Sequence, residues 1–253
     1  MVTFSLQSGS NGNSVYVEAG GTRLLFDAGI SGRKAEQRMA THRRDIRRVD
    51  AVILSHDHRD HTACAGIYQR KYGLPIYTSP ITARAIKRHL GPVSDVRHFR
   101  AGEVLEIGEV TIHTIRTPHD AVEGVVFIVE HEGKRLGIFT DLGHPFVGLL
   151  GLLESVDGAY LETNYDPQML EDGPYPPHLK ARIRGLGGHI SNVEAADLLR
   201  RCGRRRPRWI AMAHLSAENN RPELALETQK EAVGKEYPVH HASRHAVSPM
   251  LTL

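Results

Sequence analysis

The sequence predicts an α/β fold in which two mixed β-sheets lie between layers of helices. Three observations predict it: β-branched segments bounded by glycine turns recur along the first half of the chain, helical patterns fall between them, and the chain is long enough for a large core. A hydrophobic fraction of 40% in 253 residues supports one core of ordinary size. We therefore expect a single domain over residues 1–253.

The predicted strands follow apolar runs that end in glycine or polar residues. Residues 14–20 and 22–29, joined at Gly20 and Gly21, have the pattern of a hairpin. Further strands are predicted at 51–55, 110–115, 125–141 and 156–163, because β-branched residues dominate these runs.

Helical periodicity predicts six helices between and after these strands, at 62–72, 80–90, 146–154, 176–186, 191–202 and 221–234. The fifth has a capping box, since Ser191 and Glu194 can each satisfy a free backbone donor at the helix start. The sixth carries Pro222 in its first turn, where proline is favoured. Hairpins with interleaved helices are typical of the layered fold stated above.

Composition excludes several classes of protein. The first residues lack a basic segment followed by an apolar stretch, and no window approaches the length of a membrane span. The expected location is the cytoplasm, without membrane association. Cys64 and Cys202 are the only cysteines, too few for a disulfide framework, and we expect them to be packing thiols.

The stretch "ILSHDHRDHTA" places His56, His58 and His61 around Asp57 and Asp60, directly after an apolar strand. Burying such groups without partners costs several kcal/mol, roughly 2–7 for each neutral group and more for charges. Imidazole nitrogens and carboxylate oxygens are ligands for zinc, manganese or iron. A solvated polar turn is the alternative, but the density of ligands favours a metal site.

One metal needs about four ligands, so further ones should come from later in the chain. Three candidates follow apolar runs: His119 in "TPHDA", Asp141 in "IFTDLG" and His214 in "IAMAHLS". Each alone would more often be a core or surface residue. Together with the histidine cluster they predict a shared metal site.

These residues carry a resemblance to a known family. The series Asp27, His56, His58, Asp60, His61, His119, Asp141 and His214 resembles the motifs of the metallo-β-lactamase fold superfamily, over nearly the whole chain. The segments "SGSNGNS", "TPHDA", "ETNYD", "YPPHLKARIRGLGGHISN" and "HLSAENN" resemble its YycJ/WalJ-like branch of hydrolases and exonucleases. Tyr165 departs from the branch, which would carry histidine there.

The resemblance implies a four-layer αββα sandwich with two divalent transition-metal ions, zinc or manganese with iron as a further candidate. It assigns His56, His58 and His119 to one metal, assigns Asp60, His61 and His214 to the other, and makes Asp141 the bridge. Asp27 would support the histidine loop from outside the ligand shell. For Asp57, Asp120 and His144, loop polarity or support of the ligands is the better interpretation.

Two close metals can share a hydroxide nucleophile and neutralise a phosphoryl group, so hydrolysis is the expected reaction. Asp60 would also orient that hydroxide. His189 in "GGHISN" is the candidate for protonating the leaving oxygen, since two glycines precede it and a helix start follows it. The segment resembles a loop in related ribonucleases that supplies a histidine to the scissile phosphate. An ordinary loop histidine is the alternative.

The arginines cluster at 43–48 ("RRDIRR") and at 200–208 ("RRCGRRRPR"). They could contact phosphates away from the metals, with strong salt dependence. A solvated helix end explains them equally well. No aromatic ladder accompanies them, so a stacking platform for single strands is not indicated.

Together these features favour a metal-dependent phosphodiesterase, and the branch resemblance implies an exonuclease acting on DNA, with nucleic acid as its partner. The enzymatic alternative is a small-molecule hydrolase for a cyclic phosphodiester, thioester or lactone. The alternative from another class is a non-catalytic binding protein, which a complete ligand set disfavours.

Overall fold

The computed structural model describes residues 1–253 and contains two seven-stranded sheets that face each other. Sheet A has the strand order β14-β1-β2-β3-β4-β5-β6, and sheet B has the order β13-β12-β11-β10-β9-β8-β7. In each sheet the hairpin strands pair antiparallel and the strands joined by helices pair parallel. Both sheets are therefore mixed, as the sequence predicts.

The strands of sheet A are β1 (Val2–Gln7), β2 (Ser14–Ala19), β3 (Thr22–Phe26), β4 (Ala51–Ile53), β5 (Ile76–Thr78), β6 (Val96–His98) and β14 (Leu251–Thr252). Those of sheet B are β7 (Val104–Ile107), β8 (Val110–Thr117), β9 (Gly124–His131), β10 (Lys134–Phe139), β11 (Gly158–Glu162), β12 (Trp209–Ala213) and β13 (Val239–His241). The C-terminal strand β14 returns to pair with β1.

The helices are α1 (Gly32–Thr41), α2 (Arg59–Thr62), α3 (Ala65–Tyr72), α4 (Pro80–Leu90), α5 (Leu149–Glu154), α6 (Pro167–Asp172), α7 (Pro177–Arg184), α8 (Asn192–Cys202) and α9 (Pro222–Val233). Two 3₁₀ turns lie at Ile46–Arg48 and Gly203–Arg205. No helix combines the length and the apolar character that crossing a bilayer requires.

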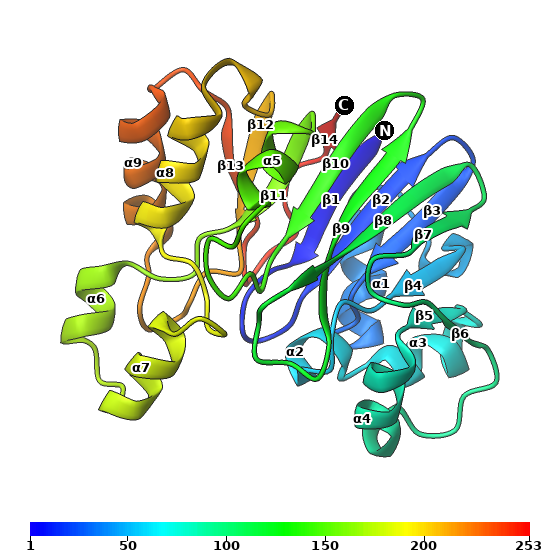
Figure 1. The fold of residues 1–253 in the computed structure, drawn as a ribbon. Helices are drawn as coiled ribbons and strands as arrows, with labels where there is room; N and C mark the ends of the chain where they lie inside the picture. Colours follow the sequence, from blue (N-terminus) through cyan, green and yellow to red (C-terminus); the bar gives the residue numbers. More distant parts are fainter.

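Three apolar clusters account for the layers. The largest, which includes Phe26 and Phe127, fills the space between the sheets. A second packs sheet A against α1, α3 and α4 through residues such as Met39 and Ile86, and a third packs sheet B against α5, α8 and α9 through residues such as Leu198. Figure 1 shows α8 and α9 on one outer face and α3 and α4 on the other. The four-layer αββα sandwich is confirmed.

Local signals explain most helix boundaries and the differences from prediction. The predicted helix 62–72 begins only at Ala65, because Cys64 leaves helical geometry at φ −117° and ψ 5°. The short helix α2, which ends at Thr62, was not predicted. The predicted helix 146–154 begins only at Leu149, after Gly148 at φ 97°. The capping box at Ser191 is present and Pro222 opens α9, as predicted.

Two further helices, α1 and α6, escape prediction. Helix α1 buries few apolar side chains, chiefly Ala35 and Met39, so few residues mark its buried face, although Ser31 caps it. Helix α6 is only six residues long, and its signal lies in the Asp166 cap followed by Pro167. Figure 1 shows α6 and α7 together outside the sandwich.

Candidate metal centre

The carboxyl ends of the parallel strands bring the predicted ligands to one end of the sandwich. Asp27 directly follows β3, and the histidine loop follows β4 in the same sheet. In sheet B, Asp141 lies just beyond β10 and His214 directly follows β12. Polar groups gather at this kind of edge because the strand ends leave room for loops between the layers.

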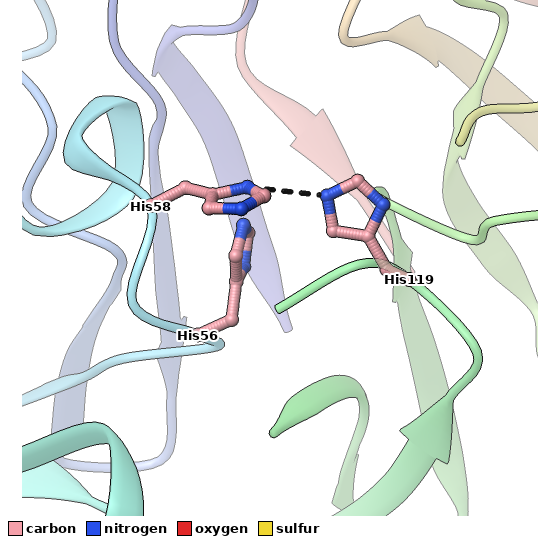
Figure 2. Close-up of side chains that lie close together, drawn as sticks. All are labelled: His56, His58 and His119. Atoms are coloured by element: carbon pink, nitrogen blue, oxygen red, sulfur yellow. Dashed lines mark hydrogen bonds between the residues drawn. The ribbon is translucent and has the colours of Figure 1, made fainter. Parts of the chain in front are cut away.

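His56, His58 and His119 form the first group of possible ligands, with one ligand atom from each lying within 4.8 Å of the others. Figure 2 shows the imidazoles of His56 and His58, from the loop after β4, converging with His119. The Nδ1 of His58 lies 3.2 Å from the Nε2 of His119. These are the three residues predicted to share a metal.

Asp60, His61 and His214 form the second group. The Oδ2 of Asp60 lies 3.3 Å from the Nε2 of His214 and 3.5 Å from the Nε2 of His61. Asp141 lies between the two groups, because its Oδ1 is 3.5 Å from the Nε2 of His119 while its Oδ2 is 3.3 Å from the Nε2 of His61. All seven predicted ligands are thus brought together.

Two buried atoms at this site lack any hydrogen-bond partner: the Nε2 of His56 and the Oδ2 of Asp141. Leaving a buried polar atom unpaired costs about 1–3 kcal/mol, and such atoms are rare in folded proteins. A divalent cation would satisfy both, since imidazole nitrogen and carboxylate oxygen are metal ligands. The donor set therefore fits metal binding.

Hydrogen bonds on the far side of each imidazole fix its orientation. The Nδ1 of His56 lies 2.9 Å from the Ser55 hydroxyl, and the Nδ1 of His119 lies 2.8 Å from the Gly188 carbonyl oxygen. The Nδ1 of His61 lies 2.8 Å from a carboxylate oxygen of Asp27. Such contacts leave the Nε2 of these three histidines facing the other ligands, as in metal-bound histidines.

Asp27 supports the histidine loop in the way the sequence predicts. Its Oδ1 accepts hydrogen bonds from the backbone N–H of Ser55 at 2.8 Å and from the Ser55 hydroxyl at 2.9 Å. Asp27, Asp141 and His214 all have positive φ, at 67°, 58° and 55°. This conformation costs a non-glycine residue about 1–3 kcal/mol, and such strain concentrates at functional sites.

In the metal-free protein, nearby carboxylates raise the pKa values of two of the ligand histidines. Burial alone would lower the pKa of His214, but the Asp141 carboxylate and contacts with Asp60 and Glu162 raise it to about 10. Burial likewise opposes charge on His61, yet Asp141, Asp27 and Asp60 hold its pKa well above the usual value. Metal cations would replace these protons, which couples metal binding to pH.

His189 lies beside the ligands and is held by Glu162, a residue whose role the sequence did not reveal. The Nδ1 of His189 donates to the Oε1 of Glu162 at 2.6 Å, while the backbone N–H of Leu142 donates to Oε2 at 2.9 Å. Glu162 is fully buried at the end of β11, so its position after an apolar strand was the available signal. Burial would raise its pKa, but His189 lowers it to about 2.

His189, Glu162, Asp141 and His214 also form a possible ligand group. However, both oxygens of Glu162 already accept hydrogen bonds, from Leu142, His189 and, at 3.3 Å, the backbone N–H of Ile190. We therefore assign Glu162 to holding His189 rather than to binding metal.

A hollow of about 280 Å³ opens over the ligands, and its lining contains no hydrophobic residue: Ser10, His58, Arg59, Asp60, Asp141, Arg182, His189 and His214. Arg182 is fixed at the mouth by two contacts with Asp120, at 2.6 and 3.0 Å. Arg59 comes from α2 and Arg182 from α7. These isolated arginines were not predicted, because single arginines carry no sequence pattern.

The "SGSNGNS" loop braces the second ligand group. The Ser8 hydroxyl accepts a hydrogen bond from the His214 backbone N–H at 2.8 Å, and the Asn13 side chain donates to the Oδ2 of Asp60 at 3.3 Å. Gly29 lies against the backbone of Asp60. A Cβ at this position would lie 1.6 Å from the Asp60 carbonyl oxygen, so glycine is what allows the two backbones to lie this close.

The two arginine runs lie at the opposite end of the sandwich. Arg208 directly precedes β12, whose other end leads to His214, and the 43–48 run precedes β4, whose other end leads to His56. A five-residue strand spans roughly 16 Å. Arg206 reaches inward to the carbonyl oxygens of Leu199 and Val233, at 3.1 and 3.2 Å. Any contact between these runs and phosphates would therefore be made away from the metals, and it stays a prediction.

Three further polar residues support the loops of the site, as expected. The Oδ1 of Asp57 accepts a hydrogen bond from the Val122 backbone N–H at 3.0 Å, and the Nδ1 of His144 lies 2.7 Å from the Leu186 carbonyl oxygen. Asp120 holds Arg182.

Comparison with known proteins agrees with the geometry. The family model of the metallo-beta-lactamase superfamily matches residues 8–214. The chain is 34% identical to a Streptococcus pneumoniae protein named exodeoxyribonuclease WalJ, covering 97% of this chain and 95% of that one. It is 32% identical to a Bacillus anthracis protein named exodeoxyribonuclease YycJ, covering 93% and 92% of the two chains.

Solved structures share the fold at lower identity. The metallo-beta-lactamase fold protein YhfI from Bacillus subtilis superposes with a TM-score of 0.76 at 16% identity, over 99% of both chains. The short form of human tRNase Z superposes with a TM-score of 0.64 at 16% identity, over 98% of both chains.

Proposed function

The chain belongs to the metallo-beta-lactamase superfamily, and from this premise we propose that it is a metal-dependent phosphodiesterase that removes nucleotides from the ends of DNA. The family predicted from the histidine motif is confirmed, as is the YycJ/WalJ-like branch. One observation carries the proposal: the likeness to two proteins named exodeoxyribonucleases extends over nearly the full length of each. We propose that residues 1–253 act as one hydrolase domain.

The proposed ligands of the first metal are His56, His58 and His119, those of the second are Asp60, His61 and His214, and Asp141 would contact both. Two bound divalent ions, zinc or manganese with iron as a further candidate, would supply a hydroxide at neutral pH and neutralise charge on the phosphoryl group. The unpaired Nε2 of His56 and Oδ2 of Asp141 support this assignment.

The residues around the metals would orient the substrate and move the proton. Asp60 would accept a hydrogen bond from the attacking hydroxide and so aim it at phosphorus. His189, with its Nδ1 held by Glu162, would protonate the leaving oxygen through Nε2. Arg59 and Arg182 line the hollow and would bind phosphate oxygens of the DNA backbone.

The lining of the hollow also bears on the alternatives. The hollow directly over the metals is polar and charged throughout, which suits a phosphoryl group better than the acyl group of a thioester or lactone. A small phosphodiester would fit the same hollow and remains the enzymatic alternative. A non-catalytic binding protein would not need His189 held by a buried carboxylate.

The test is a panel of substrates and metals. Protein stripped of metal and reloaded with zinc, manganese or iron is incubated with DNA and RNA labelled at one end, and with a nitrophenyl phosphodiester. We expect stepwise loss of nucleotides from DNA only in the reloaded protein, and none with His58→Ala. Hydrolysis of the nitrophenyl ester without any shortening of DNA would contradict the nuclease and favour a small-molecule phosphodiesterase.

A further inference from the structure

A second, smaller hollow adjoins the first beside α7. It measures about 160 Å³ and shares Ser10, Arg182, His189 and His214 with the hollow over the metals. Unlike the first, it has hydrophobic residues in its lining: Tyr175, Leu179 and Ile183. We call it the side pocket, and its mixed character means that it is built for something other than phosphate.

We propose that the side pocket binds the base of the nucleotide adjoining the scissile phosphate at a DNA end. This inference rests on the proposed nuclease function and adds to it the group that is recognised beside the metals. A phosphate over the metals would place the attached nucleoside within reach of the pocket, because His189 and His214 border both hollows.

The size of the pocket limits what can enter. A volume of about 160 Å³ is below the roughly 300–1,000 Å³ of pockets for drug-sized ligands, so it suits one ring system. Ile183 of the lining is itself buried in a small apolar cluster with Tyr165 and Leu170.

The chemistry of the lining suits a nucleobase. Tyr175 offers an aromatic ring, and Leu179 extends the apolar wall. Stacking on one aromatic side chain is worth about 5- to 150-fold in affinity and tolerates any base. Asn164 and Ser216 add an amide and a hydroxyl that can meet the polar edge of a base.

Local sequence holds Tyr175 in place before any ligand arrives. Pro174 precedes it and Pro176 and Pro177 follow it, so the flanking backbone has little freedom. Pro177 also begins α7, whose first turns carry Leu179. A ring fixed in advance loses little conformational entropy on binding. The side pocket thus gives a role to the "YPPHL" part of the segment "YPPHLKARIRGLGGHISN", whose His189 is the proposed acid.

Binding of small probes tests the proposal without relying on turnover. The affinities of the zinc-loaded full chain for deoxyadenosine 5′-phosphate, deoxyadenosine 3′-phosphate and deoxyribose 5-phosphate are measured by calorimetry. We expect at least one deoxyadenosine phosphate to bind at least 10-fold more tightly than the sugar phosphate, about 1.4 kcal/mol. Tyr175→Ala should reduce that preference to near unity, while Tyr175→Phe should keep it.

Metal content and thermal unfolding of each variant check that the site and the fold are intact, and Leu179→Trp, which fills the pocket, gives a second variant should Tyr175→Ala unfold. Equal binding of all three probes by the unsubstituted chain would overturn the inference, as would an unchanged preference in both Tyr175→Ala and Leu179→Trp. Base-dependent binding in a protein that leaves DNA intact would support the pocket and contradict the nuclease, so the two failures are distinguishable.

Discussion

The two ends of the β-sandwich carry charged residues in opposite ways. At the end of the sandwich where the carboxyl ends of β4 and β12 lie, His56, Asp141 and His214 are buried. At the other end, arginines are exposed and paired with nearby carboxylates, as in Arg200 with Asp197 and Arg205 with Glu154. Exposed pairs of this kind contribute only about 0–1 kcal/mol each. The candidate metal centre therefore lies where charged residues are buried and converge, and not where they are densest along the chain.

The largest expected effect comes from removing a ligand at the buried end. His58→Ala or Asp141→Ala should lower the metal content per chain and reduce DNA hydrolysis by roughly 10³-fold or more, because the proposed nucleophile depends on the metals. Elemental analysis and end-labelled DNA measure the two effects. Arg205→Ala, at the opposite end of the sandwich, is the control substitution. Full metal content and activity in Asp141→Ala would contradict the proposed metal centre.

Removal of the proposed acid should have the next largest effect. His189→Ala should keep its metals and lose roughly 10²- to 10⁴-fold in turnover on DNA. The loss should be much smaller on a nitrophenyl phosphodiester, whose leaving group departs without a proton. Initial rates on both substrates and metal analysis make the comparison. An equal loss on the two would assign His189 to phosphate binding, and a loss of metal would make it a ligand.

Glu162 should link stability to pH through its buried carboxylate. Its pKa in the folded protein is about 2, below the usual 4.5, so the ionised form stabilises the fold above pH 4.5, and this contribution is lost as the pH falls toward 2. In metal-free protein, Glu162→Gln should cost about 1–3 kcal/mol at neutral pH. Urea unfolding of both forms across pH measures the difference. A difference that stays constant or grows on acidification would contradict this assignment.

The smallest expected effects come from replacing arginines at the two ends of the sandwich. Arg59→Ala and Arg182→Ala should each weaken DNA binding and reduce the slope of log affinity against log salt by about 1. Arg204→Ala together with Arg205→Ala should leave affinity and slope unchanged, since that end faces away from the hollow. Titrations of each variant with DNA at several salt concentrations measure the affinity and its slope. If the second pair changed the slope and the first did not, the DNA path would cross the arginine end.

The sequence by itself determined those features that neighbouring residues create. The histidine loop spans only six positions after a strand, so the sequence alone required His56, His58, Asp60 and His61 to lie close together. The capping box of α8 and the proline start of α9 are equally local. Helices α1 and α6 were missed because few apolar side chains or few residues mark them.

Only the tertiary structure decided which distant residues meet. Glu162 meets His189 across 27 positions because the loop before α8 lies against the end of β11. His119 approaches His58 across 61 positions because β8 and β4 end close together where the two sheets face each other, a meeting that only the family resemblance had implied. The arginine runs lie at the far end because they precede β4 and β12, whose other ends lead to the ligands. Spacing fixes contacts within a loop, whereas strand order and direction fix contacts between loops, and these depend on packing the whole chain.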